Sequence, residues 1–322
     1  MKFRKYIVIL SFTILGLPGL ASANCGEVSI TEMNWASAAV VTHISKFFME
    51  QGYGCKVTAI PSSVTPSLTS LAETGKPEIV TELWVNGAPA FQPLLDEGKI
   101  VSLADVLSDG AVEGLWVPDY LMKDHPELAT IEGVLNNPEL VGNTLHNCPD
   151  GWGCKHINES MAKALDMEKK GIKLFNHGSS ETLTASIARA YENKEPWLGY
   201  YWAPTAVLGK YPMVKVDMGQ FDAQIHKCNA DPKCEQVGVS NWPQAPVRTV
   251  VSTEFSQKNP EISQLMSKVA FTNAQMNTLL AWKEKNSASA EETAVHFITN
   301  YQSTWSDWVS DSAKTRLASL LK

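Results

Sequence analysis

The sequence lacks the signatures of common catalytic, nucleotide-binding and metal sites. Its 322 residues contain no G-x-S-x-G motif, no H-E-x-x-H motif and no Walker or Rossmann glycine loop. The histidines are scattered, and no metal-ligand spacing is found at His43, His146, His156 or His177. We therefore expect a chain that is not an enzyme and that holds no metal and no cofactor.

Positive charge is also scarce. The chain has 27 lysines and arginines against 34 acidic residues, a formal net charge of -7. An acidic chain of this kind is poorly suited to nucleic acid or to anionic membranes. It has neither an internal repeat nor a low-complexity segment, and its length suggests two domains.

The amino terminus has the pattern of a secretory signal peptide. Basic residues within 2–5 precede an apolar run over 7–20, and the small residues 21–23 follow. The apolar run is shorter than the roughly 20 residues that a membrane-spanning helix needs. Cys25 follows Asn24 rather than a small residue, which argues against a lipid anchor. We expect cleavage before Asn24 and a periplasmic protein.

An even number of cysteines in an exported protein favours disulfides. The six are Cys25, Cys55, Cys148, Cys154, Cys228 and Cys234. Spacing favours Cys148–Cys154 and Cys228–Cys234, which leaves Cys25–Cys55, although six cysteines allow fifteen pairings. The alternative, a zinc site, fits less well because C-x5-C differs from the usual ligand spacing.

Strands and helices alternate in the first third of the chain. Strands are predicted at Glu27–Thr31, Lys56–Ile60 and Glu78–Trp84, and helices at Ala36–Gln51 and Thr65–Glu73. This order implies a parallel sheet with helices on its faces. Cys25 and Cys55 each precede a strand of that set, so a bridge between them is geometrically plausible.

Later segments repeat this style. We predict a helix opened by Ser179 or Ser180, a strand at Leu198–Trp202, and helices from Asn259, over Ser289–Tyr301 and over Trp305–Leu321. The chain is expected to cross between two lobes near Trp116-Val117-Pro118 and to return near Pro246-Val247-Arg248. The first lobe would then be 24–115 with 247–322, and the second 116–246.

Four of the ten tryptophans lie in turns or at strand ends. They are Trp35, Trp84, Trp152 and Trp202. Ligands of open parallel sheets bind beyond the carboxyl ends of the strands, so these indoles are well placed to line a cleft. A quaternary ammonium group has no N–H donor, and indole faces recognise it through their quadrupole and apolar area. Most tryptophans are nevertheless ordinary core residues, and that alternative is weakest for Trp152, which lies between two glycines.

At these residues the sequence resembles the substrate-binding proteins of glycine betaine/proline-type ABC importers. The most specific match is the segment Asn147-Cys148-Pro149-Asp150-Gly151-Trp152-Gly153-Cys154. Tyr200-Tyr201-Trp202-Ala203-Pro204, Leu83-Trp84 and Trp35 are similar to further segments of the family. The resemblance implies a two-lobed α/β fold of the type II periplasmic-binding-protein kind, with mainly parallel sheets and the ligand in the cleft.

The resemblance also implies the site. Trp84, Trp152 and Trp202 would form an aromatic cage with Trp35 as a fourth wall, and the amides of Gly153 and Cys154 would bind a ligand carboxylate. Ala88 stands where some members have a carboxylate-binding histidine, and Ser37 stands where choline-selective members have an acid. Further candidate ligand contacts are Glu32, Ser37, Glu82 and His177. A capping or solvent-exposed role is the alternative for the two acids, and a local capping role for His177.

We therefore expect a monomeric component of an importer, working with a membrane permease and its ATPase. The expected ligand is the osmoprotectant glycine betaine. The alternatives are trimethylamine N-oxide, choline, carnitine or dimethylsulfoniopropionate in the same role, and a sensor module or an amino-acid-binding protein on the same fold.

Overall fold

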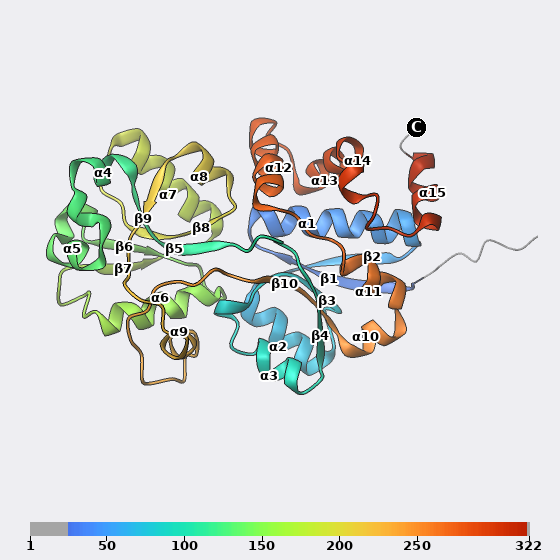
Figure 1. The fold of residues 1–322 in the computed structure, drawn as a ribbon, viewed down its shortest axis with the longest axis horizontal. Coiled ribbons are helices and arrows are strands. Elements are labelled where there is room, and N and C mark those ends of the chain that lie inside the picture. Colours follow the sequence, from blue (N-terminus) through green and yellow to red (C-terminus); the bar gives the residue numbers. More distant parts are fainter. Residues whose placement is uncertain (1–24, 321–322) are drawn as a thin grey trace, which may run out of the picture.

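The computed structural model describes residues 25–320, which form two lobes side by side (Figure 1). Each lobe is built on one open five-stranded sheet with helices packed on both faces. The predicted signal peptide, residues 1–23, lies outside the described residues. Within 25–320, no helix combines the length and the apolar character that a membrane span requires.

The first lobe contains both ends of the described chain. Its strand order is β2-β1-β3-β10-β4, with β1 Glu27–Met33, β2 Lys56–Ser62, β3 Ile79–Trp84, β4 Ile100–Asp105 and β10 Val247–Ser252. Its helices are α1 Ala36–Phe47, α2 Val64–Thr74, α3 Phe91–Asp96, α10 Thr253–Lys258, α11 Pro260–Met266, α12 Asn273–Lys285, α13 Ala290–Asn300, α14 Gln302–Trp305 and α15 Asp311–Leu320.

The second lobe repeats the plan. Its strand order is β7-β6-β8-β5-β9, with β5 Val112–Pro118, β6 Thr144–Asn147, β7 Lys173–Asn176, β8 Gly199–Ala203 and β9 Met213–Lys215. Its helices are α4 Asp119–Asp124, α5 Ile131–Asn136, α6 Gly153–Ala164, α7 Ser180–Asn193, α8 Ala206–Lys210 and α9 Ala223–Ala230.

Both sheets are mixed rather than mainly parallel in their pairing: each has two parallel and two antiparallel neighbouring pairs, although all of its strands but one run in the same direction. In each described sheet only the fourth strand of the order, β10 or β5, runs against its neighbours. Both reversed strands are the first that the chain forms after crossing from the other lobe. The carboxyl ends of the parallel strands therefore face the cleft, whereas β10 and β5 present their amino ends there.

Two antiparallel segments join the lobes. The backbones of Ala111 and Ala245 exchange two hydrogen bonds of 2.9 Å each, and the Val106 amide donates to the Val247 carbonyl at 2.8 Å. Strand β5 begins at Val112 and pairs with β8 from that residue on. The first crossing therefore lies earlier than the predicted one, because Trp116 is already inside the second sheet.

The predicted helix over Trp305–Leu321 is interrupted. Helix α14 ends at Trp305 and α15 begins at Asp311. Between them, Trp308 turns into the core, where its ring lies 6.1 Å from that of Phe48, and Trp305 lies 5.2 Å from the same ring. The break falls at Ser310, whose backbone N–H donates to the Tyr53 hydroxyl at 3.0 Å and whose side-chain oxygen accepts a hydrogen bond of 3.4 Å from the Ala313 amide in the first turn of α15.

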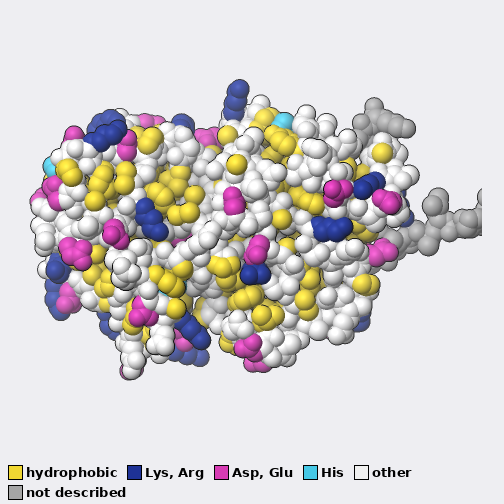
Figure 2. Space-filling model, viewed as in Figure 1, with side chains coloured by type: hydrophobic (Ala, Val, Ile, Leu, Met, Phe, Trp, Pro, Cys, Tyr) yellow, Lys and Arg dark blue, Asp and Glu magenta, His cyan; other side chains and the backbone are white. Residues whose placement is uncertain are grey.

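All three predicted disulfides are confirmed, and they leave no cysteine free. Cys25–Cys55 joins the starts of the adjacent parallel strands β1 and β2. The other two bridges close short loops in the second lobe. Figure 2 shows acidic and basic side chains interspersed over the visible face, which is typical of solvated surfaces.

Candidate functional site

A cavity lies between the lobes at the cleft-facing strand ends. About 370 Å³ of space there is free of protein atoms, including the part that opens to solvent. Ten residues line it: Trp35, Val64, Trp84 and Gly87 from the first lobe, and Glu113, Trp152, Gly153, Cys154, Tyr200 and Trp202 from the second. All six residues predicted as principal ligand contacts are therefore brought together.

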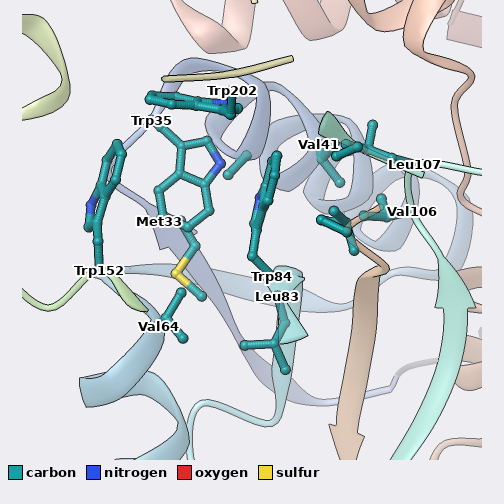
Figure 3. Close-up of a cluster of buried hydrophobic side chains, with 14 of the residues drawn as sticks. Met33, Trp35, Val41, Val64, Leu83, Trp84, Val106, Leu107, Trp152 and Trp202 are labelled. Atoms are coloured by element: carbon teal, nitrogen blue, oxygen red, sulfur yellow. The ribbon is translucent and has the colours of Figure 1, made fainter. Parts of the chain in front are cut away.

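The four indoles form the walls of this cavity (Figure 3). Trp152 lies edge-on to two of them, with ring centroids 5.3 Å from Trp35 and 5.1 Å from Trp202. Each indole is at most 8% exposed. Trp35 follows β1 after one intervening residue, and Trp84 is the last residue of β3. Trp202 is near the end of β8. The rule that sheets bind ligands beyond the carboxyl ends of strands thus accounts for three of the four walls.

The fourth wall, Trp152, stands on the loop that Cys148–Cys154 closes. The loop reaches across the cleft: the Trp152 indole N–H donates to Asn34 Oδ1 at 2.8 Å, and the Thr65 amide donates to the Gly151 carbonyl at 3.3 Å. Gly151 has a φ of 81°, a conformation that glycine adopts without strain. The disulfide and these contacts fix the position of Trp152.

The lobes touch at two glycines. A Cβ placed on Gly87 would lie 2.7 Å from the Cα of Gly153, and one on Gly153 would lie closer still to the Gly87 carbonyl. Both neighbours are backbone atoms, which cannot rotate away. The glycines therefore let the lobes close tightly at the edge of the cavity.

Helix α6 directs its amino terminus at the cavity. Trp152 is its N-cap and provides no side-chain hydrogen bond to the first turn. The following residues, Gly153 and Cys154, both line the cavity. Helix amino termini carry partial positive charge and unsatisfied amides, so this end of the cavity suits an anionic ligand group.

Glu113 is a cavity residue that the sequence analysis did not identify. It is fully buried in the cleft, where its Oε1 accepts a hydrogen bond of 2.6 Å from the Tyr200 hydroxyl. Burial raises the pKa of its carboxyl to about 7, and hydrogen bonds from Tyr200 and Asn86 only partly oppose this rise. Glu113 therefore stays protonated to a higher pH than an exposed glutamate, whose pKa is 4.5.

Glu113 was not predicted because its strand, β5, runs antiparallel to its neighbours β8 and β9. It lies at the amino end of β5, opposite Trp202 in the register of β5 with β8. The rule that ligands bind beyond the carboxyl ends of strands does not identify a residue at an amino end. The available signal was an acid at the inward positions of a strand, in alternation with the buried Leu115 and Val117. Val64, Gly87 and Tyr200 were missed as well.

The further candidates take other places. Glu82 is wholly buried and does not line the cavity; Ser37 donates to it at 2.6 Å. Glu32 lies 3.3 Å from His43 Nε2, in a larger groove that adjoins the cavity at Trp35 and Trp202. His177 Nε2 lies 2.9 Å from His146 Nδ1, away from the cavity. Among residues 25–320, no cluster of three or more His, Cys, Asp or Glu side chains is arranged to hold a metal ion.

The two buried acids predict how stability varies with pH. Burial raises the pKa of both Glu82 and Glu113 to about 7, above the ordinary value of 4.5. The folded protein then keeps protons that the unfolded chain has released, so this contribution to stability is complete below pH 4.5 and is lost as the pH rises toward 7. Each acid should lower the free energy of unfolding by up to about 3 kcal/mol over this range.

Urea unfolding of the empty protein between pH 4.5 and 8 measures this effect. Glu113→Gln should flatten the fall in the urea midpoint, because the amide does not titrate. A midpoint with the same pH dependence in Glu113→Gln and in the parent would contradict the assignment.

Comparison with known proteins places the chain in a family. Residues 26–300 match the family described as the substrate binding domain of ABC-type glycine betaine transport systems. The chain is 22% identical over 173 residues to the glycine betaine/proline betaine-binding periplasmic protein of Salmonella typhimurium. That match covers 51% of each protein, so the chain spans about half the length of this curated relative.

Solved structures share the fold. A choline-binding protein of an ABC transporter, in complex with choline, superposes with a TM-score of 0.74 at 17% identity, over 92% of this chain and 99% of that one. The lactococcal OpuAC in its closed form with glycine betaine gives a TM-score of 0.68 at 21% identity, over 88% and 100%. The two open sheets flanked by helices are therefore a periplasmic-binding-protein fold. With the family match extending over most of its length, the chain belongs to the substrate-binding domains of ABC-type glycine betaine transport systems.

Proposed function

We propose that this protein binds glycine betaine in the cavity between its lobes and delivers it to the permease of an ABC importer. The observation that carries the proposal is the arrangement of four indoles around one small buried space. A trimethylammonium group fills such a space with methyl groups and spread positive charge, and each desolvated indole face contributes about 1–2 kcal/mol. No bond of the ligand is made or broken.

The carboxylate of glycine betaine would lie at the polar end of the cavity. The amides of Gly153 and Cys154 line this end, and Glu113, whose pKa burial raises to about 7, would supply a further donor in its protonated form. Trimethylamine N-oxide is the second candidate, because the same donors serve an N-oxide oxygen. Choline has no anionic oxygen, so its hydroxyl would be a weaker partner for the α6 amides than a carboxylate or an N-oxide.

The compartment that we propose is the periplasm, and two features of the chain support it. Three disulfides need an oxidising environment, and the predicted signal peptide directs the chain across the inner membrane. The protein would act as a periplasmic monomer and present both closed lobes to the permease, which works with an ATPase.

Titration calorimetry with glycine betaine, trimethylamine N-oxide, choline and glycine tests the proposal. Glycine should bind at least about tenfold more weakly than glycine betaine, because the cage cannot replace the water around an N–H-bearing ammonium group. If glycine or another unmethylated amino acid binds as tightly as the best methylated ligand, the protein is an amino-acid-binding protein instead. If choline binds more tightly than the other three ligands, the cavity is suited to a cation rather than to a zwitterion such as glycine betaine.

A further inference from the structure

The backbone of β3 is distorted where it reaches the cavity. Val80 pairs with Val250 and Leu83 with Arg248, so that Thr81 and Glu82 together face Thr249. This is a β-bulge, and Glu82 within it has a φ of 52°. A positive φ is uncommon for residues other than glycine, and such backbone distortions cluster at functional sites.

The side chain at this position is buried behind the cage. Glu82 is 0% exposed, and its Oε1 accepts hydrogen bonds of 2.6 Å from the Trp35 indole N–H and from Ser37 Oγ. The Trp84 side chain is close enough to lower the pKa of this carboxyl. One acid thus holds the Trp35 indole by a hydrogen bond and lies near the Trp84 indole, the two that the first lobe contributes to the cavity.

The other oxygen of this carboxyl makes no interaction with the described part of the chain that would stabilise the fold. Glu82 Oε2 is buried and has no hydrogen-bond partner in the described structure. Within residues 25–320, no basic side chain forms an ion pair with Glu82. A buried acid without a cation is costly, and an apolar residue would pack there without that penalty.

A cationic ligand supplies the missing partner. A methylated ammonium group in the cavity would lie against the indole faces, among them that of Trp35, whose N–H points at Glu82. Donation from this indole N–H to a carboxylate leaves the ring richer in electrons, which strengthens its attraction for a cation. Burial raises the pKa of Glu82 to about 7, and a bound cation favours its ionised form. The charge would then act across a dry, low-dielectric wall, where Coulomb attraction is stronger than in water.

We propose that Glu82 is a positioning residue of the cage, which holds the indole of Trp35 in place and, when a cationic ligand is bound, provides an anionic counter-charge behind the indoles without touching the ligand. The inference rests on the proposed function, since it requires a methylated ammonium ligand in the cavity. The carboxyl would then have two separate effects on affinity. Holding the indole in place affects the binding of any ligand, whereas the negative charge affects only the binding of a cationic ligand.

A pair of ligands separates these tasks. Glycine betaine and 3,3-dimethylbutanoate have the same shape and the same carboxylate, but a neutral carbon replaces the charged nitrogen in the second. Displacement titrations give both affinities, and their ratio reports how strongly the site prefers the positive charge. Glu82→Gln keeps the shape and an acceptor oxygen but removes the charge, and should lower this ratio about tenfold or more.

Two further variants complete the design. Glu82→Asp keeps the charge but withdraws it from the indoles, so both ligands should bind more weakly while the ratio stays near that of the parent. Glu78→Gln removes a first-lobe acid that accepts a hydrogen bond from the Ser29 amide at the other end of β3, away from the cavity, and should leave both affinities within about twofold. Melting temperatures confirm that each variant is folded.

The outcomes distinguish this proposal from the proposed function. The ratio of the affinities for glycine betaine and 3,3-dimethylbutanoate could be the same in Glu82→Gln as in the parent. If the parent still binds glycine betaine tightly, this result would overturn only the counter-charge role. Parental affinities for both ligands in Glu82→Asp would overturn the positioning role. A parent protein that binds no methylated ammonium compound would overturn both proposals.

Discussion

Replacing Trp152 by alanine is expected to weaken glycine betaine binding by about 2 kcal/mol or more, roughly thirtyfold, measured by calorimetry. The change removes one wall of the cage. It also removes the edge contacts to Trp35 and Trp202, and the hydrogen bond from the indole N–H to Asn34 across the cleft. Loss of ligand contact and loss of closure act in the same direction, which is why a large effect is expected.

Trp116→Ala is the matched control for this variant. Trp116 is also a tryptophan of the second lobe, and its indole N–H donates to the Tyr201 carbonyl at 2.9 Å, but it does not line the cavity. Its loss should leave the affinity within about threefold of the parent. Equal affinities for Trp152→Ala and the parent would show that the ligand does not bind in the cage.

The sequence predicted which tryptophans line the cavity because most of their positions obey a simple topological rule. Short strands ending in tryptophan can be recognised from alternation and flanking turns, and parallel strands end at the same edge of a sheet. Trp35, Trp84 and Trp202 follow from that rule. Trp152 needed a different signal, the glycines and cysteines that flank it.

What the sequence did not show depends on contacts between distant segments. Glu113 lies in the site because β5 is reversed after crossing from the first lobe, and local pattern does not reveal that reversal. The position of Glu82 behind the indoles depends on a bulge opposite β10, a strand far away along the chain. Gly87 is ordinary as a turn residue, and its closeness to Gly153 exists only once the lobes have closed.

That closeness makes Gly153→Ala the most damaging small change for binding. The added Cβ would meet the backbone carbonyl of Gly87, and neither side can move without opening the cleft. If binding depends on closure, the affinity for glycine betaine should fall about 100-fold or more, because a closed state that is seldom reached lowers the apparent affinity in proportion. The residue is helical and lies in the first turn of α6, where alanine is favourable, so the stability of the empty protein should be kept or slightly raised.

Gly209→Ala provides the control for this last prediction. Gly209 is also helical, within α8 of the second lobe, and a Cβ there would meet nothing within 4 Å. This variant should bind like the parent, whereas Gly153→Ala should bind weakly with an unchanged or higher melting temperature. Small-angle scattering adds a direct measure of closure: ligand should make the parent and Gly209→Ala more compact but leave Gly153→Ala open. Parental affinity in Gly153→Ala would mean that the ligand is held without the contact between Gly87 and Gly153, and that the second lobe binds in a more open arrangement than the one described.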